Sequence, residues 1–238
     1  WLRAGIQAFS GIASTVTVSL SEIMPIFEDK GKNNKNNKNN KNMTGRKILL
    51  VVDVQRDFID GSLAVPGAER IIPEINEIKV RFDKVYFTLD WHPKNHCSFK
   101  ANGGTWPEHC VHYTLGASLA RGLLDGLDET KTRFILKGRD KDREEYGAFA
   151  GVAETSQSKT GTETEISPNA ATPDLFKHGD EVTVCGIAAE YCVLETLKNV
   201  YRLSQEIGFH VNIFMKGVVG FDCAPLLSWM AENGVNEY

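Results

Sequence analysis

Short runs of β-branched and other apolar residues alternate along this chain with stretches in which apolar residues recur at helical spacing. The run Ile48–Val52 is apolar throughout, which is typical of a parallel strand covered on both faces. Further strands are predicted at residues 84–89, 132–136, 181–185 and 209–215. Helices are predicted at residues 68–80, from 191 onward and at 224–233. This alternation indicates an α/β fold built on a mostly parallel sheet.

Charged side chains follow three of these strands. Asp53 ends the first strand, Asp90 the second and Lys137 the third, while the strand that ends at Cys185 leads through a glycine turn to Cys192. Ligands and catalytic groups of open α/β sheets gather outside the carboxyl ends of the strands. The sequence therefore predicts that these side chains meet at one edge of the sheet.

Cys192 lies where a strand gives way to a helix. The partial positive charge and free N–H groups of a helix start lower a thiol's pKa and can hold an oxyanion. Taken alone, such a cysteine is more often a buried structural residue, Asp53 could equally cap a turn, and Lys137 could be solvated. Together they form a nucleophile with a proton carrier and a charge partner.

A second group of polar residues occupies the long loop at residues 91–116. Asp90 and His92 are two residues apart, so both point the same way from an extended chain, and His96 and His109 follow. Four of the six histidines fall within residues 92–112. One carboxylate with several imidazoles suits zinc, iron or manganese. The alternative is a polar loop with exposed histidines; the loop's two cysteines lack the paired spacing of soft-metal ligands.

Charge and cysteine content narrow the functional classes. The chain has 238 residues and a net charge of −4, which gives no nucleic-acid-binding footprint. Five cysteines at irregular spacing do not resemble a disulfide framework and favour a reducing compartment, the cytoplasm. No apolar run is long enough to span a membrane.

The chain divides into three unequal parts. Residues 1–30 form a mildly apolar N-terminal extension whose role stays open between a targeting segment and an accessory helix. Residues 31–42 are an Asn/Lys repeat that cannot bury apolar surface and is predicted to be a disordered linker. The expected domain covers residues 43–238, with a polar insertion at about 150–172.

Six short motifs then occur in a characteristic order: VVDVQRDF, DWHPKNHCSF, TWPEHCV, ILKGRD, YGAF and VCGIAAEYCV. In this order and spacing the sequence resembles the nicotinamidases, members of the isochorismatase-like cysteine hydrolases. The resemblance covers about residues 46–235. It implies a three-layer α/β/α Rossmann-like fold with a mostly parallel central sheet of about six strands. One departure is Glu190, which stands where the family often has Asp.

The resemblance assigns roles by position. It implies a catalytic triad of Asp53, Lys137 and Cys192. It implies a metal held by Asp90, His92 and His109, with His96 at a position that supplies a fourth ligand in some members. It implies an oxyanion hole from the backbone N–H groups of Ala188 and Cys192, with a cis peptide between Ile187 and Ala188. It implies aromatic walls from Phe58, Trp106 and Tyr146.

The function so implied is hydrolysis of nicotinamide to nicotinate and ammonia through a cysteine thioester, in NAD salvage. It requires one divalent metal ion, zinc being favoured over iron or manganese, and no organic cofactor. The partner is the small-molecule substrate, with no nucleic acid or membrane, and a homo-oligomer stays open. Two alternatives remain: another cysteine amidase of the family acting on carbamoyl or ureido compounds, and a non-catalytic metal- or ligand-binding α/β module. A dinucleotide-binding oxidoreductase is disfavoured, because no glycine-rich motif follows the first strand.

Overall fold

The structure, a computed structural model, describes residues 45–150 and 175–238 of the chain. The predictions for residues 1–30, for residues 31–42 and for nearly all of the insertion at about 150–172 lie outside these residues. Within the described part, six strands form one sheet in the order β3-β2-β1-β4-β5-β6. All neighbouring strands are parallel.

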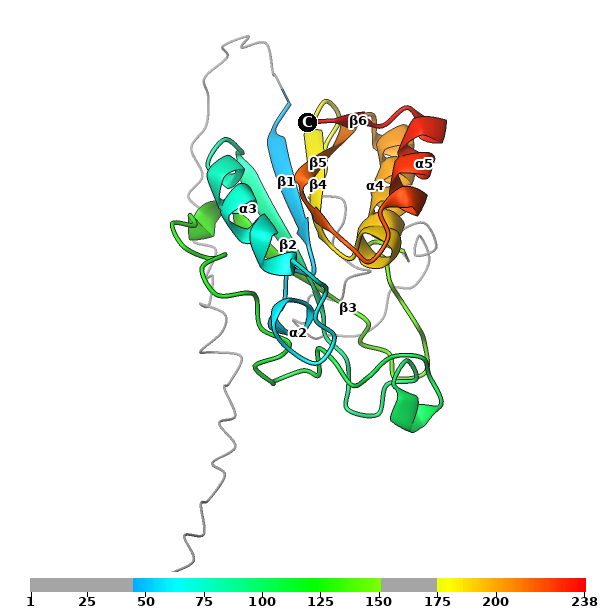
Figure 1. Ribbon diagram of the computed structural model, residues 1–238. Coiled ribbons are helices and arrows are strands. Elements are labelled where there is room, and N and C mark those ends of the chain that lie inside the picture. Colours follow the sequence, from blue (N-terminus) through cyan, green and yellow to red (C-terminus); the bar gives the residue numbers. More distant parts are fainter. Residues whose placement is uncertain (1–44, 151–174) are drawn as a thin grey trace, which may run out of the picture. The chain divides into compact units, whose positions relative to one another are not determined.

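Helices separate most of the strands along the chain, but the long connection from the second strand to the third carries only single helical turns (Figure 1). The strands are β1 (Lys47–Val52), β2 (Lys84–Asp90), β3 (Thr132–Lys137), β4 (Glu181–Ile187), β5 (His210–Val219) and β6 (Asn236–Glu237). The α-helices are α2 (Arg56–Ile59), α3 (Ile71–Lys79), α4 (Leu194–Ile207) and α5 (Ala224–Asn233). Single helical turns are η1 (Ala68–Arg70), η2 (Lys100–Asn102), η3 (Glu129–Lys131) and the π-helical η5 (Ala189–Val193).

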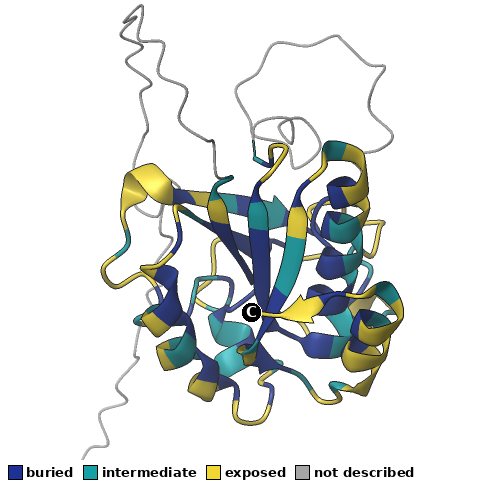
Figure 2. Cartoon of the chain, turned by 90° about the horizontal axis from the view of Figure 1, so that it is seen from above, coloured by how far each residue is buried: buried dark blue, intermediate teal, exposed yellow. Residues whose placement is uncertain are grey.

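The predicted three-layer α/β/α fold is confirmed. Figure 1 shows α3 on one side of the sheet and α4 with α5 on the other. Five of the six residues of β1 are buried, and Figure 2 shows the central strands in the colour of buried residues. Helix α4 faces the sheet with an apolar stripe that includes Leu197, Val200 and Leu203. Burying such a side chain contributes about 1.5–3 kcal/mol.

Two boundaries differ from the sequence prediction for physical reasons. The helix predicted over residues 68–80 is the turn η1 followed by α3. Pro73 stands in the first turn of α3, and a proline ring there clashes with an α-helical carbonyl four residues earlier. Strand β5 runs on to Val219, four residues past the predicted end at Met215, because its pairing with β4 resumes at Val218 and Val219 after a register shift around the polar Lys216.

The strand order places one crevice at the carboxyl edge of the sheet. After β1 the chain crosses to β2 on one side, whereas β4 lies on the other side of β1. Connections that leave in opposite directions make the switch point at which open α/β sheets bind ligands. Val52 is in register with Thr88 of β2, and Asp90 is in register with Lys137 of β3. The side chains that follow these strands are thereby brought to one place.

A buried ion pair ties the opposite edge of the sheet together. Asp180, which is 2% exposed, accepts hydrogen bonds from the Arg46 guanidinium, the Arg46 backbone N–H and the Lys177 backbone N–H. Burial alone would raise the pKa of Asp180, but these donors outweigh it and lower the pKa. The bond therefore stabilises the fold above the pKa of an unfolded aspartate, about 3.9, and its contribution is lost as the pH falls further.

We expect Asp180→Asn to lower the free energy of unfolding by about 2–3 kcal/mol at pH 7, because hydrogen bonds to a charged acceptor are lost. Urea denaturation should give a constant deficit between pH 8 and about pH 5 and a shrinking one below about pH 4. The matched control is Asp60→Asn, which removes an exposed pair with Arg56 and should change stability by less than about 1 kcal/mol. A deficit for Asp180→Asn that grows towards acid pH would contradict the assignment.

Two further predictions concern disulfide bonds and membrane-spanning segments. All five cysteines are free, which agrees with the absence of a disulfide framework predicted from their spacing. Within residues 45–150 and 175–238, no helix has the length and apolar character needed to cross a membrane.

Candidate functional site

Lys137, at the end of β3, is the centre of the buried polar cluster. Its Nζ lies 2.8 Å from Asp53 Oδ2, 2.5 Å from Asp90 Oδ1 and 3.6 Å from Cys192 Sγ. Cys192 is 5% exposed and the other three side chains are buried at least as deeply. The structure thus brings together the sulfur, the ammonium and the carboxylate that the sequence placed at three different strand ends.

Charge balance sets the protonation states of this cluster. Burial alone would lower the pKa of Lys137, but Asp53 and Asp90 outweigh it and raise the pKa well above the usual value. Burial raises the pKa of Asp53 in spite of Lys137, which makes this carboxylate a stronger base.

The pKa of the Cys192 thiol is shifted in the direction opposite to the one expected from the sequence. Burial raises the pKa of Cys192 well above its usual value; Lys137 lowers it, and Asp53 and Asp90 raise it further. Burial and the two carboxylates thus oppose the effect of Lys137 on the thiol. Asp53 is the base next to Cys192 and is placed to accept the thiol proton when the sulfur attacks a substrate.

Two residues that sequence reasoning missed hold the carboxylates in place. Thr88 donates its hydroxyl to Asp53 Oδ1 at 2.6 Å. The Gln55 side-chain amide accepts from the Asp90 backbone N–H and donates to the Asp90 carbonyl, both at 2.8 Å. Both side chains are fully buried. The available signal was a glutamine two residues after the aspartate that ends a strand, because an amide buried there needs partners on both of its ends.

Asp90, His92 and His109 form a group that can hold a metal ion. One ligand atom from each lies within 4.8 Å of the others, and all three side chains are buried. Nδ1 of His92 donates to the Gly138 carbonyl, and Nδ1 of His109 donates to the Pro107 carbonyl, both at 2.8 Å. With Nδ1 protonated in this assignment, each Nε2 keeps its lone pair. Such carbonyl contacts typically orient metal-binding histidines, so the donor set fits a divalent metal.

Gly138 is required for this arrangement. It has φ +63°, and a Cβ atom there would lie 2.4 Å from the His92 ring. Burial alone would lower the pKa of His92, but Asp90 outweighs it and raises the pKa, whereas burial lowers the pKa of His109. An ion bound by these side chains would replace the proton that Asp90 favours on His92, since histidine binds metals in its neutral form.

His96 lies beside this group, with its ring centroid 4.1 Å from that of His92. Both of its nitrogens are in contact with other groups: Nδ1 with Ser98 Oγ at 2.7 Å and Nε2 with the Arg143 carbonyl at 3.0 Å. Among the described residues, the ligand group therefore contains three side chains and not His96.

A second carboxylate group, Asp53 with Asp90 and Cys192, also meets the distance condition for a metal. The Lys137 ammonium contacts all three of these side chains. The lysine already balances the charge of these carboxylates. We therefore assign the position between them to the Lys137 ammonium and not to a metal ion.

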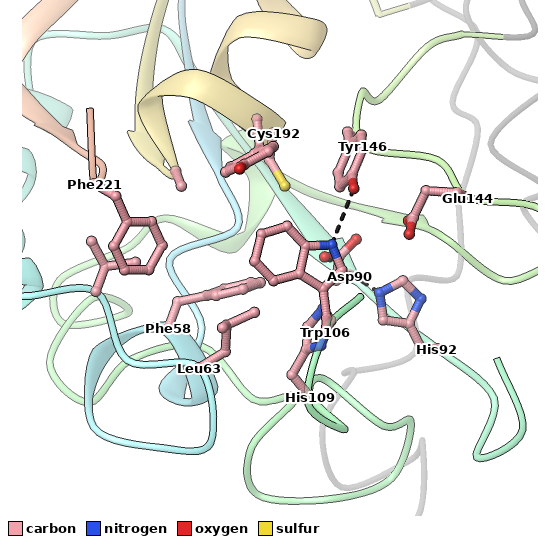
Figure 3. A pocket seen from close by; sticks show the side chains of 13 residues that line it. Phe58, Leu63, Asp90, His92, Trp106, His109, Glu144, Tyr146, Cys192 and Phe221 are labelled. Carbon is pink, nitrogen blue, oxygen red and sulfur yellow. Dashed lines mark hydrogen bonds and ion pairs between the residues drawn. The ribbon is translucent and has the colours of Figure 1, made fainter. Parts of the chain in front are cut away.

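Aromatic side chains enclose the space between the sulfur and the ligand group (Figure 3). Phe58 from α2 lies 5.6 Å from the His109 ring. Trp106 donates its indole N–H to the Tyr146 hydroxyl at 3.0 Å and meets Tyr191 edge-on at 5.1 Å. The walls are flat and apolar, with polar groups at one side, so the pocket suits a small aromatic ligand.

The turn that carries Cys192 is built around Ala188. The peptide between Ile187 and Ala188 is cis, as the sequence resemblance implied. The chain then enters the π-helical turn η5, in which the Ala188 carbonyl accepts from the N–H groups of Tyr191 and Val193. The turn holds Cys192 against the pocket at the start of α4.

The chain is similar to known proteins over most of its length. The isochorismatase domain matches residues 47–222. The chain belongs to the isochorismatase domain family. The nicotinamidase of Saccharomyces cerevisiae is 30% identical over 199 residues, which cover 71% of this chain and 86% of the yeast protein.

Solved structures are similar to this chain as well. One is the pyrazinamidase of Pyrococcus horikoshii in complex with zinc, with a TM-score of 0.60 and 30% identity over 81% of this chain and 98% of that one. Another is PnC1 from L. infantum in complex with nicotinate, with a TM-score of 0.63 and 30% identity over 82% of this chain and 93% of that one.

The isochorismatase-family pocket includes residues that the sequence did not single out. They are Leu63, Val65, Glu144, Tyr191 and Phe221. These residues come from loops or from a turn with no periodic pattern, so only Tyr191, next to Cys192 in sequence, carried a usable signal.

Proposed function

We propose that this protein is a metal-dependent nicotinamidase, which hydrolyses nicotinamide to nicotinate and ammonia through a cysteine thioester. The observation that carries the proposal is the position of Lys137. Its ammonium contacts the nucleophile, the base and the carboxylate of the metal group at once. The thiol and the metal group line one aromatic pocket, Asp53 lies beside the thiol, and the similar proteins named above include a nicotinamidase and a pyrazinamidase.

Acylation begins with substrate held between the aromatic walls. Phe58 and Trp106 confine the pyridine ring, which fixes the carboxamide beside Cys192 and replaces a bimolecular encounter by an oriented one. Asp53 accepts the thiol proton while the sulfur attacks the carboxamide carbon. Lys137 stabilises the negative charge that develops on sulfur, and the backbone N–H groups of Ala188 and Cys192 hold the oxyanion.

Release of the products uses the same carboxyl group twice. Asp53 gives its proton to the departing amide nitrogen, so that ammonia leaves and a thioester remains on Cys192. A water molecule then enters the position that ammonia vacated. Asp53 removes a proton from that water, the thioester is hydrolysed, and the thiol regains its proton as nicotinate leaves.

Asp90, His92 and His109 would hold the divalent metal, for which we propose zinc. When bound, the ion supplies a Lewis acid that can anchor the ring nitrogen of the substrate. Lys137 contacts Asp90 Oδ1. The other carboxylate oxygen, Oδ2, lies 3.5 Å from His92 Nε2 and would be available to the ion. The other parts of the reaction are carried out by side chains and backbone N–H groups of the chain itself.

The direct test is release of ammonia from nicotinamide by the full purified chain. The expected result is stoichiometric nicotinate and ammonia. A ureido or carbamoyl compound tested in parallel should react far more slowly. A folded, metal-loaded protein that releases no ammonia from nicotinamide would exclude the proposed reaction, and preferential turnover of the ureido compound would favour the other cysteine amidases.

Removal of the metal provides a separate prediction. We expect His92→Ala and His109→Ala to lose the bound metal ion in elemental analysis and to lower kcat/KM for nicotinamide by about 10²-fold or more, since the ring would lose its orientation. The matched control is His112→Ala, a histidine of the same loop outside the ligand group. It should retain one ion per chain and its activity. Full activity in a metal-free preparation would contradict a role for the ion.

A further inference from the structure

The loop between β5 and α5 brings one large aromatic residue to the pocket. Phe221 is 53% exposed, yet its side chain lines the same pocket as Phe58 and Cys192. In Figure 3 it lies on the side away from His92, with Cys192 and Phe58 between them. A phenylalanine at the rim of an aromatic pocket can contact a bound ligand and bury its own apolar surface when it does so.

A carboxylate holds this loop in position. Glu190 Oε1 accepts the backbone N–H groups of Phe221 and Asp222, each at 3.0 Å. Charge-assisted bonds of this kind are about twice as strong as neutral ones. Asp222 in turn accepts the N–H of Ala224 at the start of α5, at 2.8 Å. The conformation of the loop is therefore fixed on both sides of Phe221.

The contact leaves no room between the loop and the turn that carries the nucleophile. A Cβ atom on Gly220 would lie 2.2 Å from Glu190 Oε2 and 2.7 Å from the Ala189 Cβ. Glu190 belongs to η5, two residues before Cys192. The position of Phe221 in the pocket wall is therefore fixed relative to the sulfur of Cys192, because Glu190 connects the two segments.

We propose that Phe221, positioned by Glu190, sets the size limit of the substrate on the side of the pocket remote from the metal group. The inference rests on the proposed nicotinamidase function and deepens it. With the ring nitrogen towards Asp90, His92 and His109 and the carboxamide at Cys192, ring carbons 4 and 5 face the Phe221 side. Carbon 6, next to the nitrogen, faces the metal side. The preferred substrates are then pyridine carboxamides without substituents on carbons 4 and 5.

Methyl-substituted nicotinamides probe this limit. The quantity to measure is the selectivity, which is kcat/KM for the methyl compound divided by kcat/KM for nicotinamide. Phe221→Ala should raise it by about 10-fold or more for a methyl group on carbon 4 or 5, since relief of one methyl clash in an apolar pocket is worth about 10–200-fold. It should leave the selectivity for 6-methylnicotinamide unchanged. Leu227→Ala, an exposed residue of α5 outside the pocket, should alter none of these ratios.

Glu190 is tested as a positioning residue by the same ratio. Glu190→Ala should raise the selectivity for the same methyl compounds as Phe221→Ala does, and the double variant should show no additional gain. Glu190→Gln keeps one oxygen to accept both N–H groups and should retain most of the wild-type selectivity. Because selectivity compares two substrates on one folded enzyme, partial unfolding does not change it.

The outcomes separate this proposal from the reaction itself. A wild-type protein without nicotinamide turnover contradicts the proposed function. Normal nicotinamide turnover, combined with selectivity that Phe221→Ala leaves unchanged for carbons 4 and 5, shows that Phe221 does not limit the substrate. A gain in Phe221→Ala that Glu190→Ala does not reproduce shows that Glu190 does not position it.

Discussion

Cys192→Ala is expected to lower kcat for release of ammonia from nicotinamide by at least about 10⁴-fold, because no other group in the pocket can form the acyl intermediate. The substitution removes one sulfur from a side chain that is 5% exposed, so the fold should persist. Rate measurements should be paired with nicotinate binding, which the aromatic walls and the metal group should still support. Acid-quenched wild-type protein should carry the mass of a nicotinoyl group, and the variant should not.

The other cysteines supply the control for this experiment. Cys97→Ala changes a half-buried cysteine that does not line the pocket and should leave kcat within about twofold of the wild type. Retention of more than a tenth of the wild-type kcat in Cys192→Ala would contradict covalent catalysis and would favour direct attack by water. A dead but correctly folded Cys97→Ala would show that loss of activity in this series does not report on the nucleophile.

The sequence predicted best the elements that are determined by neighbouring residues, namely the strands and the charged residues that end them. The run Ile48–Val52 could only be a buried strand, and its aspartate had to follow at the carboxyl edge of the sheet. The same argument predicted that Asp90 and Lys137 end their strands at this edge. The parallel pairing of β2 with β3 then sets the two residues side by side. Where strand ends carry the functional groups, periodicity therefore predicts both the fold and the position of much of the candidate site.

The parts that could not be predicted depend on contacts between distant segments. Phe221 follows a strand whose apolar pattern is interrupted at Lys216, so its approach to Cys192 is visible only when β5 is seen to continue. After a register shift β5 pairs again with β4 at Val218 and Val219, opposite Gly186 and Ile187, and the loop that follows reaches the edge where the pocket lies. The raised thiol pKa was missed for a related reason, because the effect of Lys137 on Cys192 is opposed by Asp53 and Asp90 across the cluster.

The largest combined effect on stability and activity is expected for Lys137→Met. The lysine is 1% exposed and separates Asp53 from Asp90, so its removal leaves two buried carboxylates without a cation. Breaking a buried pair in this way typically costs about 3–5 kcal/mol. For a domain of this size the loss corresponds to a Tm lower by about 10 °C, measured with chelator present so that no metal ion replaces the ammonium. Activity should fall together with stability.

The double variant Asp53→Asn/Lys137→Met distinguishes the two effects. Removing one carboxylate relieves the repulsion, so we expect it to be more stable than Lys137→Met alone while it stays inactive, because the base is gone. Lys216→Met, at an exposed lysine of β5, should change stability by less than about 0.5 kcal/mol. A Lys137→Met protein as stable as the wild type would show that the carboxylates do not need the ammonium. Recovery of activity in the double variant would show that Asp53 is not the proton carrier.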